Sequence, residues 1–177
     1  MLVNDTFAQR PSILPDLNFT FYPIPDFDDA GKACKYASTK PAFCACDDIE
    51  ACAVDVLGCS GGCSGDAARK LMDFIACFEG VRNPSQGGPY PPPDLDPARL
   101  LNCSMDAPFV QGMNLCLADT NRVLSLHHRT KDVADARNIH TTPTMMINGV
   151  GSAITAPIAT PDDMLKHLCK YGLAAAC

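Results

Sequence analysis

The sequence has no cluster of Lys and Arg residues, no run of 18 apolar residues and no Cys-x-x-Cys motif. A nucleic-acid binder needs a basic face, whereas 20 acidic against 14 basic residues give this chain a net charge of −6. A membrane-spanning helix needs about 20 apolar residues in succession, and cytosolic zinc sites use paired Cys-x-x-Cys ligands. These absences argue against a nucleic-acid partner, a membrane span and a metal cofactor.

The first residues also lack the basic and apolar segments of a signal peptide. Eleven cysteines and three Asn-x-Ser/Thr acceptors, at Asn4, Asn18 and Asn102, nevertheless favour the secretory pathway, because disulfides persist and N-glycans are added there. We therefore expect a lysosomal or extracellular glycoprotein whose signal peptide lies before residue 1; a cytosolic protein is the alternative. The odd cysteine count leaves at least one thiol, and Cys177 is the first candidate for it.

The chain has 177 residues, of which 47% are hydrophobic and 19% are charged, as in a single globular domain. Aromatic and β-branched residues at 18–22 predict a strand, and the segments 144–147 and 154–158 predict a hairpin after the Asn-Gly turn. Residues 26–65 hold six cysteines without strong periodicity, which indicates a disulfide-held segment with short helical pieces. Apolar spacing predicts helices at 66–80, 95–103, 107–124 and 160–172.

Thr142 and Pro143 stand directly before the predicted hairpin. A cis bond between them would turn the chain sharply and expose the backbone of the preceding residue. An extended substrate could then pair with the exposed N–H and C=O groups, as a peptide adds to a sheet edge. The alternative is an ordinary trans bond at the start of a strand. We expect the substrate loop, because a hairpin and a capped helix follow it.

These features resemble those of the gamma-interferon-inducible lysosomal thiol reductases, a family of the thioredoxin-like superfamily. Cys34, Cys44 and Cys52 fall in the order of the family signature, and the last two have its spacing. Further similar segments are 17–23, 50–55, 75–79, 101–105, 142–143, 147–149 and 168–172. The sequence departs from the signature at 35–37, where Lys-Tyr-Ala replaces Gln-His-Gly, and at Asp47, which replaces Asn. The distance from Cys34 to Cys44 is three residues too long, and Cys46, Cys59 and Cys63 are additional.

The resemblance implies one α/β domain over residues 1–177. It would have a thioredoxin-like core, a disulfide-rich helical insertion at 26–125, and a cis-proline loop, hairpin and C-terminal helix at 139–173. The family's first strand and catalytic Cys-x-x-Cys would lie before residue 1. The implied activity is thiol–disulfide oxidoreduction: the reduction of disulfides in protein or peptide substrates by an external thiol donor, without a cofactor. The chain alone is then expected to be inactive.

Cys44 and Cys46 form a close dithiol that could substitute for the missing catalytic pair, although each could instead belong to a structural disulfide. The spacing and position of the other cysteines favour structural roles. Cys59 and Cys63 predict one bridge, and Cys77, Cys103, Cys116 and Cys169 predict core residues or bridges. The competing hypothesis is a redox-inactive, disulfide-rich secreted domain that binds peptides or acts as a chaperone.

The histidines are weaker candidates. His127 and His128 are expected just after a helix end, where a cationic imidazole is favoured, and His140 precedes the proline loop. Packing or surface positions fit all three better than catalysis or metal binding.

Overall fold

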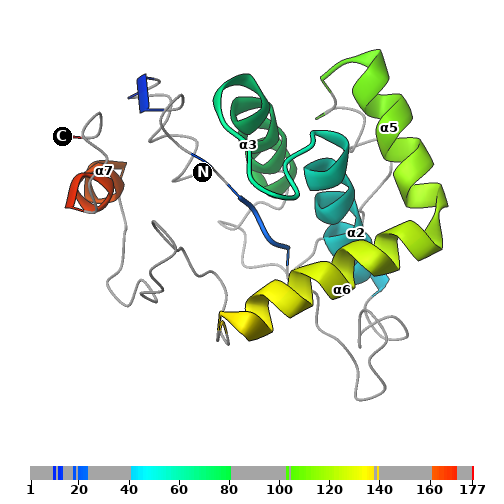
Figure 1. The fold of residues 1–177 in the computed structure, drawn as a ribbon. Coiled ribbons are helices and arrows are strands. Elements are labelled where there is room, and N and C mark those ends of the chain that lie inside the picture. The colour runs from blue at the N-terminus through cyan, green and yellow to red at the C-terminus, as the bar shows by residue number, and fades with distance from the viewer. Residues whose placement is uncertain are drawn as a thin grey trace.

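The structure is a computed structural model that describes residues 10, 12–13, 18, 20–23, 41–80, 103, 105–137, 139, 161–170 and 177. Helices make up 75% of these residues, and none of them lies in a strand. The predicted α/β class with a thioredoxin-like core is therefore wrong. The helices are α2 (Pro41–Val56), α3 (Gly65–Gly80), α5 (Ala107–Ala118), α6 (Thr120–Ala136) and α7 (Pro161–Lys170) (Figure 1).

The segment predicted as the strand 18–22 shows why the fold class was wrong. Phe21 and Tyr22 line a pocket together with side chains of α2 and α6, and the described residues of the segment lie in no strand. Aromatic and β-branched residues favour a strand only where a neighbouring strand and a packing face are present. The predicted hairpin 144–158, which would supply that neighbour, lies outside the described residues, as does the predicted helix 95–103 except for Cys103.

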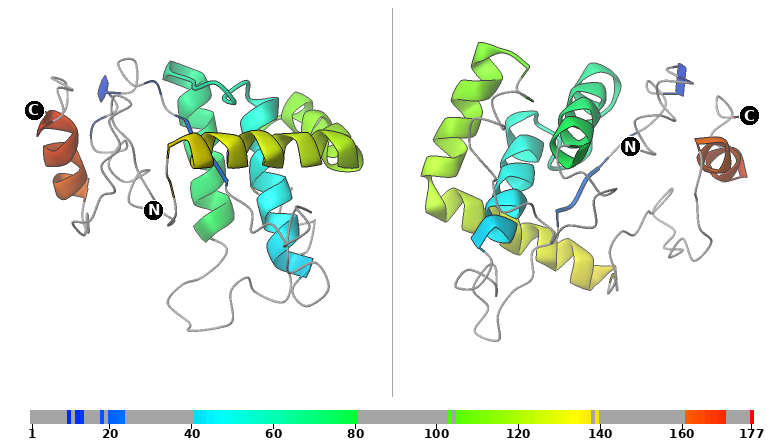
Figure 2. Two further views of the ribbon diagram at one scale, coloured as in Figure 1. Left: turned by 60° about the horizontal axis from the view of Figure 1, so that its bottom comes forward. Right: turned by 180° about the vertical axis from the view of Figure 1, so that it is seen from behind.

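α2 is the central helix and contacts α3, α5 and α6 (Figures 1 and 2). Pro41 occupies its first position, where the missing N–H removes no helical hydrogen bond. The four successive residues 51–54 are all buried, so this part of α2 is enclosed on all sides, whereas Ala45 near its start is exposed. A helix enclosed in this way has no apolar stripe of 3.6-residue period. For this reason the sequence predicted only short helical pieces here.

α3 confirms the helix predicted from apolar spacing, and α5 begins at the residue where the next helix was predicted to begin. Leu71, Phe74 and Phe78 of α3 are buried, and the ring of Phe74 meets that of Phe109 in α5 edge-on, with centroids 5.2 Å apart. α5 begins after Asp106, whose Oδ1 accepts a hydrogen bond of 2.9 Å from the Phe109 backbone N–H. Such a carboxylate satisfies an N–H that the first helical turn leaves unpaired.

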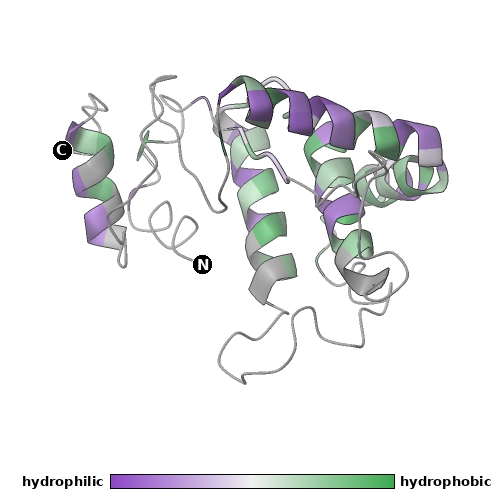
Figure 3. Cartoon of the chain, turned by 90° about the horizontal axis from the view of Figure 1, so that it is seen from below, coloured by the Kyte–Doolittle hydropathy of each residue, from purple (hydrophilic) through white to green (hydrophobic). Residues whose placement is uncertain are grey.

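The single helix predicted at 107–124 is two helices that meet at Asp119. The Asp119 N–H donates to the Cys116 carbonyl at 3.0 Å, and its carboxylate accepts from the Arg122 N–H at 3.0 Å. One residue thus ends α5 and caps α6. α6 then crosses the other helices (Figure 2). Hydrophobic residues are interspersed among hydrophilic ones along it (Figure 3). His127 lies in the middle of α6, so its expected position after a helix end is wrong.

α7 coincides with the last predicted helix, and its Leu165 and Leu168 are buried. It lies beside residues 12–13 (Figures 1 and 2), and its Leu165 and Leu168 belong with Ile13 to the same cluster of buried residues as the core of α2, α3 and α5. None of the helices described is both long and apolar enough to cross a membrane.

Candidate functional site

Four disulfides join pairs of described cysteines. They are Cys52–Cys116, Cys59–Cys63, Cys77–Cys103 and Cys169–Cys177. The bridge predicted in the short segment 59–63 and the structural roles predicted for the cysteines on helix faces are confirmed. The prediction that Cys177 is the odd thiol is wrong, because Cys177 is bonded to Cys169.

The candidate redox cysteines Cys44 and Cys46 both lie on α2, but they are not bonded to each other. Cys44 is half-buried and belongs to a disulfide, whereas Cys46 retains its thiol and is 2% exposed. Residues two positions apart on an α-helix do not face each other. The helix therefore separates the two sulfur atoms, and a disulfide between them would require α2 to unwind. Their redox role stays a prediction.

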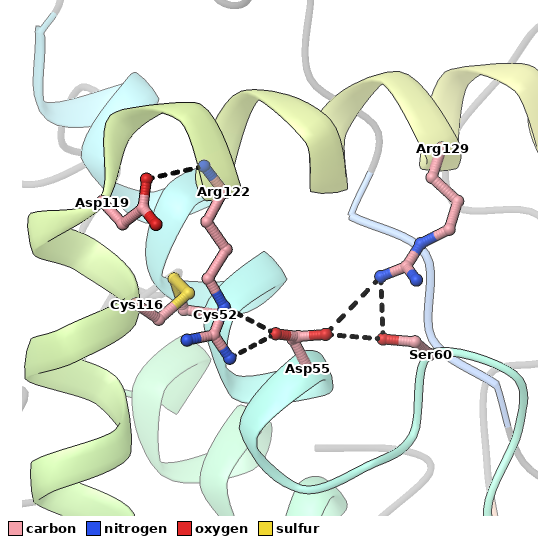
Figure 4. A network of polar contacts seen from close by, with 7 residues as sticks. All are labelled: Cys52, Asp55, Ser60, Cys116, Asp119, Arg122 and Arg129. Carbon is pink, nitrogen blue, oxygen red and sulfur yellow. Dashed lines mark hydrogen bonds and ion pairs between the residues drawn. A yellow bond between two sulfur atoms is a disulfide. The ribbon is translucent and has the colours of Figure 1, made fainter.

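A network of ionic contacts connects α2 to α6 across the surface (Figure 4). Asp55 of α2 accepts hydrogen bonds from Nε and Nη2 of Arg122, at 3.0 and 2.6 Å. Its other oxygen lies 3.6 Å from Nη2 of Arg129 and accepts from the Ser60 hydroxyl at 3.3 Å. Arg129 also donates to Ser60 Oγ at 3.0 Å. Two guanidinium groups thus share the carboxylate of Asp55, and the carboxylate of Asp119 lies beside Arg122, where it accepts from the Arg122 backbone N–H.

A small cavity of about 10 Å³ lies beside this network, with room for about one water molecule. Its lining combines Phe21, Tyr22 and Pro23 with Ala51 and Val54 of α2, Ser60, and Leu126, Arg129 and Thr130 of α6. The Thr130 hydroxyl donates to the Leu126 carbonyl at 3.0 Å. Ser60 and Arg129 are the residues that line the cavity and also belong to the ionic network. At the end of α6, the Arg137 guanidinium lies over the Tyr22 ring, 5.9 Å from its centroid. The pocket is therefore apolar inside and cationic at its edge.

A second polar contact between α2 and α6 is buried. His127 Nε2 lies 2.7 Å from Asp48 Oδ1, and the His127 side chain is 1% exposed. His127 Nδ1 is buried and has no hydrogen-bond partner among the described residues. A neutral imidazole that donates from Nε2 to the carboxylate fits this arrangement, because Nδ1 then needs no acceptor. Within the part of the chain described, no group of three or more His, Cys, Asp or Glu side chains could hold a metal ion.

Several predicted site residues lie outside the described residues: Thr142 and Pro143 of the proline loop, His140, and the acceptors Asn4 and Asn102. Asn18 is described and exposed. Its side chain packs against the backbone of Gly62, where a Cβ would lie 2.2 Å from Asn18 Oδ1. His128 is exposed on α6, as a surface role requires.

Comparison of the chain with protein-family models, with curated proteins and with solved structures found no match. The family resemblance carried by the cysteine segments therefore has no independent support, and the site must be judged on its own geometry.

Sequence reasoning missed Asp55, Ser60, Arg122 and Arg129. Arg122 and Arg129 stand seven residues apart, and this spacing places both side chains on one face of a helix. That signal was present in the sequence. Their shared partner Asp55 lies 67 residues before Arg122, and no local pattern predicts a contact over that distance.

Proposed function

We propose that this chain is a disulfide-stabilised peptide-binding domain of the secretory pathway, with no thiol–disulfide exchange at its described cysteines. The observation that carries the proposal is the state of those cysteines. Nine belong to disulfides, and the tenth, Cys46, is 2% exposed. The nucleophile of a disulfide reductase is an accessible thiolate, and these cysteines offer none.

The surface around the small cavity supports the binding part of the proposal by its composition alone. Residues 21–23 and Leu126 are mainly apolar there, and Ser60 and Arg129 are polar. The cavity itself, about 10 Å³, has room for about one water molecule, so a peptide would have to bind across its rim. The disulfides support the proposed compartment, because such bonds persist in oxidising surroundings.

The test combines a reductase assay with a binding assay on the full chain. Glutathione-driven reduction of insulin, followed by turbidity, should proceed at the rate seen without the protein. A fluorescein-labelled, alkylated insulin B chain should bind in an anisotropy titration, and Cys46→Ala should bind it equally well. Catalysed reduction of insulin would overturn the proposal, and its loss in Cys46→Ala would assign the activity to that thiol. Absence of B-chain binding would also overturn it.

The second candidate is a thiol–disulfide oxidoreductase of the lysosomal thiol reductase type. It is favoured by the family-like spacing of Cys44 and Cys52 and by the thiol of Cys46, two residues from the Cys44 disulfide. In such an enzyme a thiolate attacks a substrate disulfide to form a mixed disulfide, which a second thiol then resolves. Turnover in the same insulin assay is the outcome that this candidate requires.

A further inference from the structure

Residues 18–23 cover a mainly apolar surface formed by α2, the turn 59–63 and α6 (Figures 1 and 2). Phe21 packs against the cluster of buried residues, and Pro23 is itself buried. The cavity beside them holds only about one water molecule because the side chains of 21–23 fill the rest of the space. The residues under the segment, which we call the covered surface, are Ala51, Val54, Gly62, Leu126, Thr130 and Arg137.

Contacts at both ends hold the segment along the covered surface. At one end, Asn18 and Thr20 pack so closely on Gly62 that a Cβ there would lie 3.0 Å from Thr20 Oγ1. At the other end, the Arg137 guanidinium lies over the Tyr22 ring, 5.9 Å from its centroid. The segment is thus docked at several separate points, as a bound peptide is.

Within the part of the chain described, side chains alone hold the segment. No backbone–backbone hydrogen bond joins residues 18 and 20–23 to another described residue, and the segment precedes the first cysteine of the chain. The helices and the turn beneath it are instead fixed by two disulfides, Cys52–Cys116 and Cys59–Cys63. A segment held in this way exchanges with a released state, and a ligand that binds only the released state shifts the exchange.

Resting on the proposed function, we infer that residues 18–23 are an intramolecular ligand that blocks the peptide-binding surface of this domain. With the segment in place, a peptide has only the rim of the cavity. A peptide that replaces the segment gains the whole covered surface. The ligand class is therefore an extended peptide with two aromatic residues followed by proline, the pattern of 21–23. Its apparent affinity is reduced by the fraction of molecules in which the segment is bound.

The experiment is an anisotropy titration with a fluorescein-labelled peptide that has the sequence of residues 18–23 and blocked ends. Tyr22→Ala weakens the segment's own binding and leaves the covered surface unchanged. This variant should bind the peptide about tenfold more tightly than the unchanged chain, because the segment loses a half-buried ring that also contacts a cation. Leu115→Ala is the matched control, since Leu115 is an apolar side chain of α5 that is 62% exposed. It should bind the peptide as the unchanged chain does.

A milder variant separates release of the segment from unfolding. Tyr22→Leu keeps an apolar side chain but loses the ring under Arg137, and should bind the peptide about threefold more tightly than the unchanged chain. Thermal melts show whether each variant is folded at the temperature of the titration. A peptide with Ser at both aromatic positions of 21–22 should bind Tyr22→Ala at least tenfold more weakly than the original peptide.

Equal affinity of the unchanged chain and Tyr22→Ala for the peptide, or no binding to either at millimolar concentration, would overturn the inference. Unfolding of both Tyr22 variants would also overturn it, because an exchangeable segment is not required for the fold. If the alkylated insulin B chain still binds the full chain in these cases, the proposed function stands and only the intramolecular ligand is wrong. If neither the peptide nor the B chain binds, both are wrong.

Discussion

The two sides of α2 are held in different ways. On the α5 side, the disulfide Cys52–Cys116 joins two cysteines that are each 0% exposed. There α5 approaches so closely that a Cβ on Gly112 would lie 2.8 Å from Val56 Cγ1. On the α6 side, polar contacts are added to the buried Val123 and Leu126: Asp48 meets His127, and Asp55 meets Arg122. The carboxylate side chains there are 39% and 23% exposed.

This difference indicates which side is able to change partners. A buried disulfide and close apolar packing fix the position of α5 on α2, since core packing tolerates little displacement. Exposed ion pairs contribute at most about 1 kcal/mol each, because water and salt compete for the same charges. The exposed ion pairs of Arg122 and Arg129 with Asp55 can therefore be broken at small cost to the fold.

The largest effect is expected from removal of the buried disulfide. Cys52→Ala/Cys116→Ala opens a loop with a sequence separation of 64 residues, which should lower the free energy of unfolding by about 4 kcal/mol. Cys59→Ala/Cys63→Ala is the matched control with a separation of 4 residues, and should cost about 2 kcal/mol. Urea denaturation measures both values. Equal losses for the two double variants would contradict the special role assigned to the α5 side.

A smaller effect is expected at the buried polar contact on the α6 side. Asp48→Ala leaves the imidazole of His127 buried without its hydrogen-bond acceptor, at a cost of about 1–3 kcal/mol. Asp73→Ala, at an exposed position of α3, should change the stability by less than about 0.5 kcal/mol. The measurement is again urea denaturation. If the two alanine variants were equally stable, the Asp48–His127 contact would not contribute to the fold.

The smallest effect on stability is expected in the exposed network. Arg122→Gln removes the hydrogen bonds to Asp55, and we expect a loss below about 1 kcal/mol that shrinks further in 1 M salt. Thermal melts at low and high salt measure it. A loss as large as that of Asp48→Ala would mean that the network is structural, and the comparison between the two sides of α2 would fail.

The sequence predicted those elements that depend only on residues close together in the chain. The apolar spacing of Leu71, Phe74 and Phe78 predicted α3, and the Gly-containing segment 59–63 predicted its own disulfide. Asp119 was missed because a cap in the middle of an apolar pattern interrupts the helix without changing the periodicity. α2 was missed because burial of residues 49–54 on all sides removes the periodicity in that part of the helix.

The fold class and the site needed information that is not local. A strand at 18–22 was predicted from side-chain preference, but that preference acts only next to another strand. The pairings of Cys52 with Cys116 and of Asp55 with Arg122 join residues more than 60 positions apart. Cysteine counting predicted a disulfide framework and one thiol, yet it assigned that thiol to the end of the chain instead of to Cys46 in the core.

The most direct test of the structural role assigned to the cysteines is disulfide mapping by mass spectrometry. The native protein is unfolded in iodoacetamide without reductant and cleaved before aspartate residues, which separates Cys46, Cys52 and Cys59 into different peptides. We predict that peptide 48–54 is linked to peptide 106–118 and that Cys46 carries the alkyl group. An alkylated Cys52, or a disulfide between Cys44 and Cys46, would contradict the account.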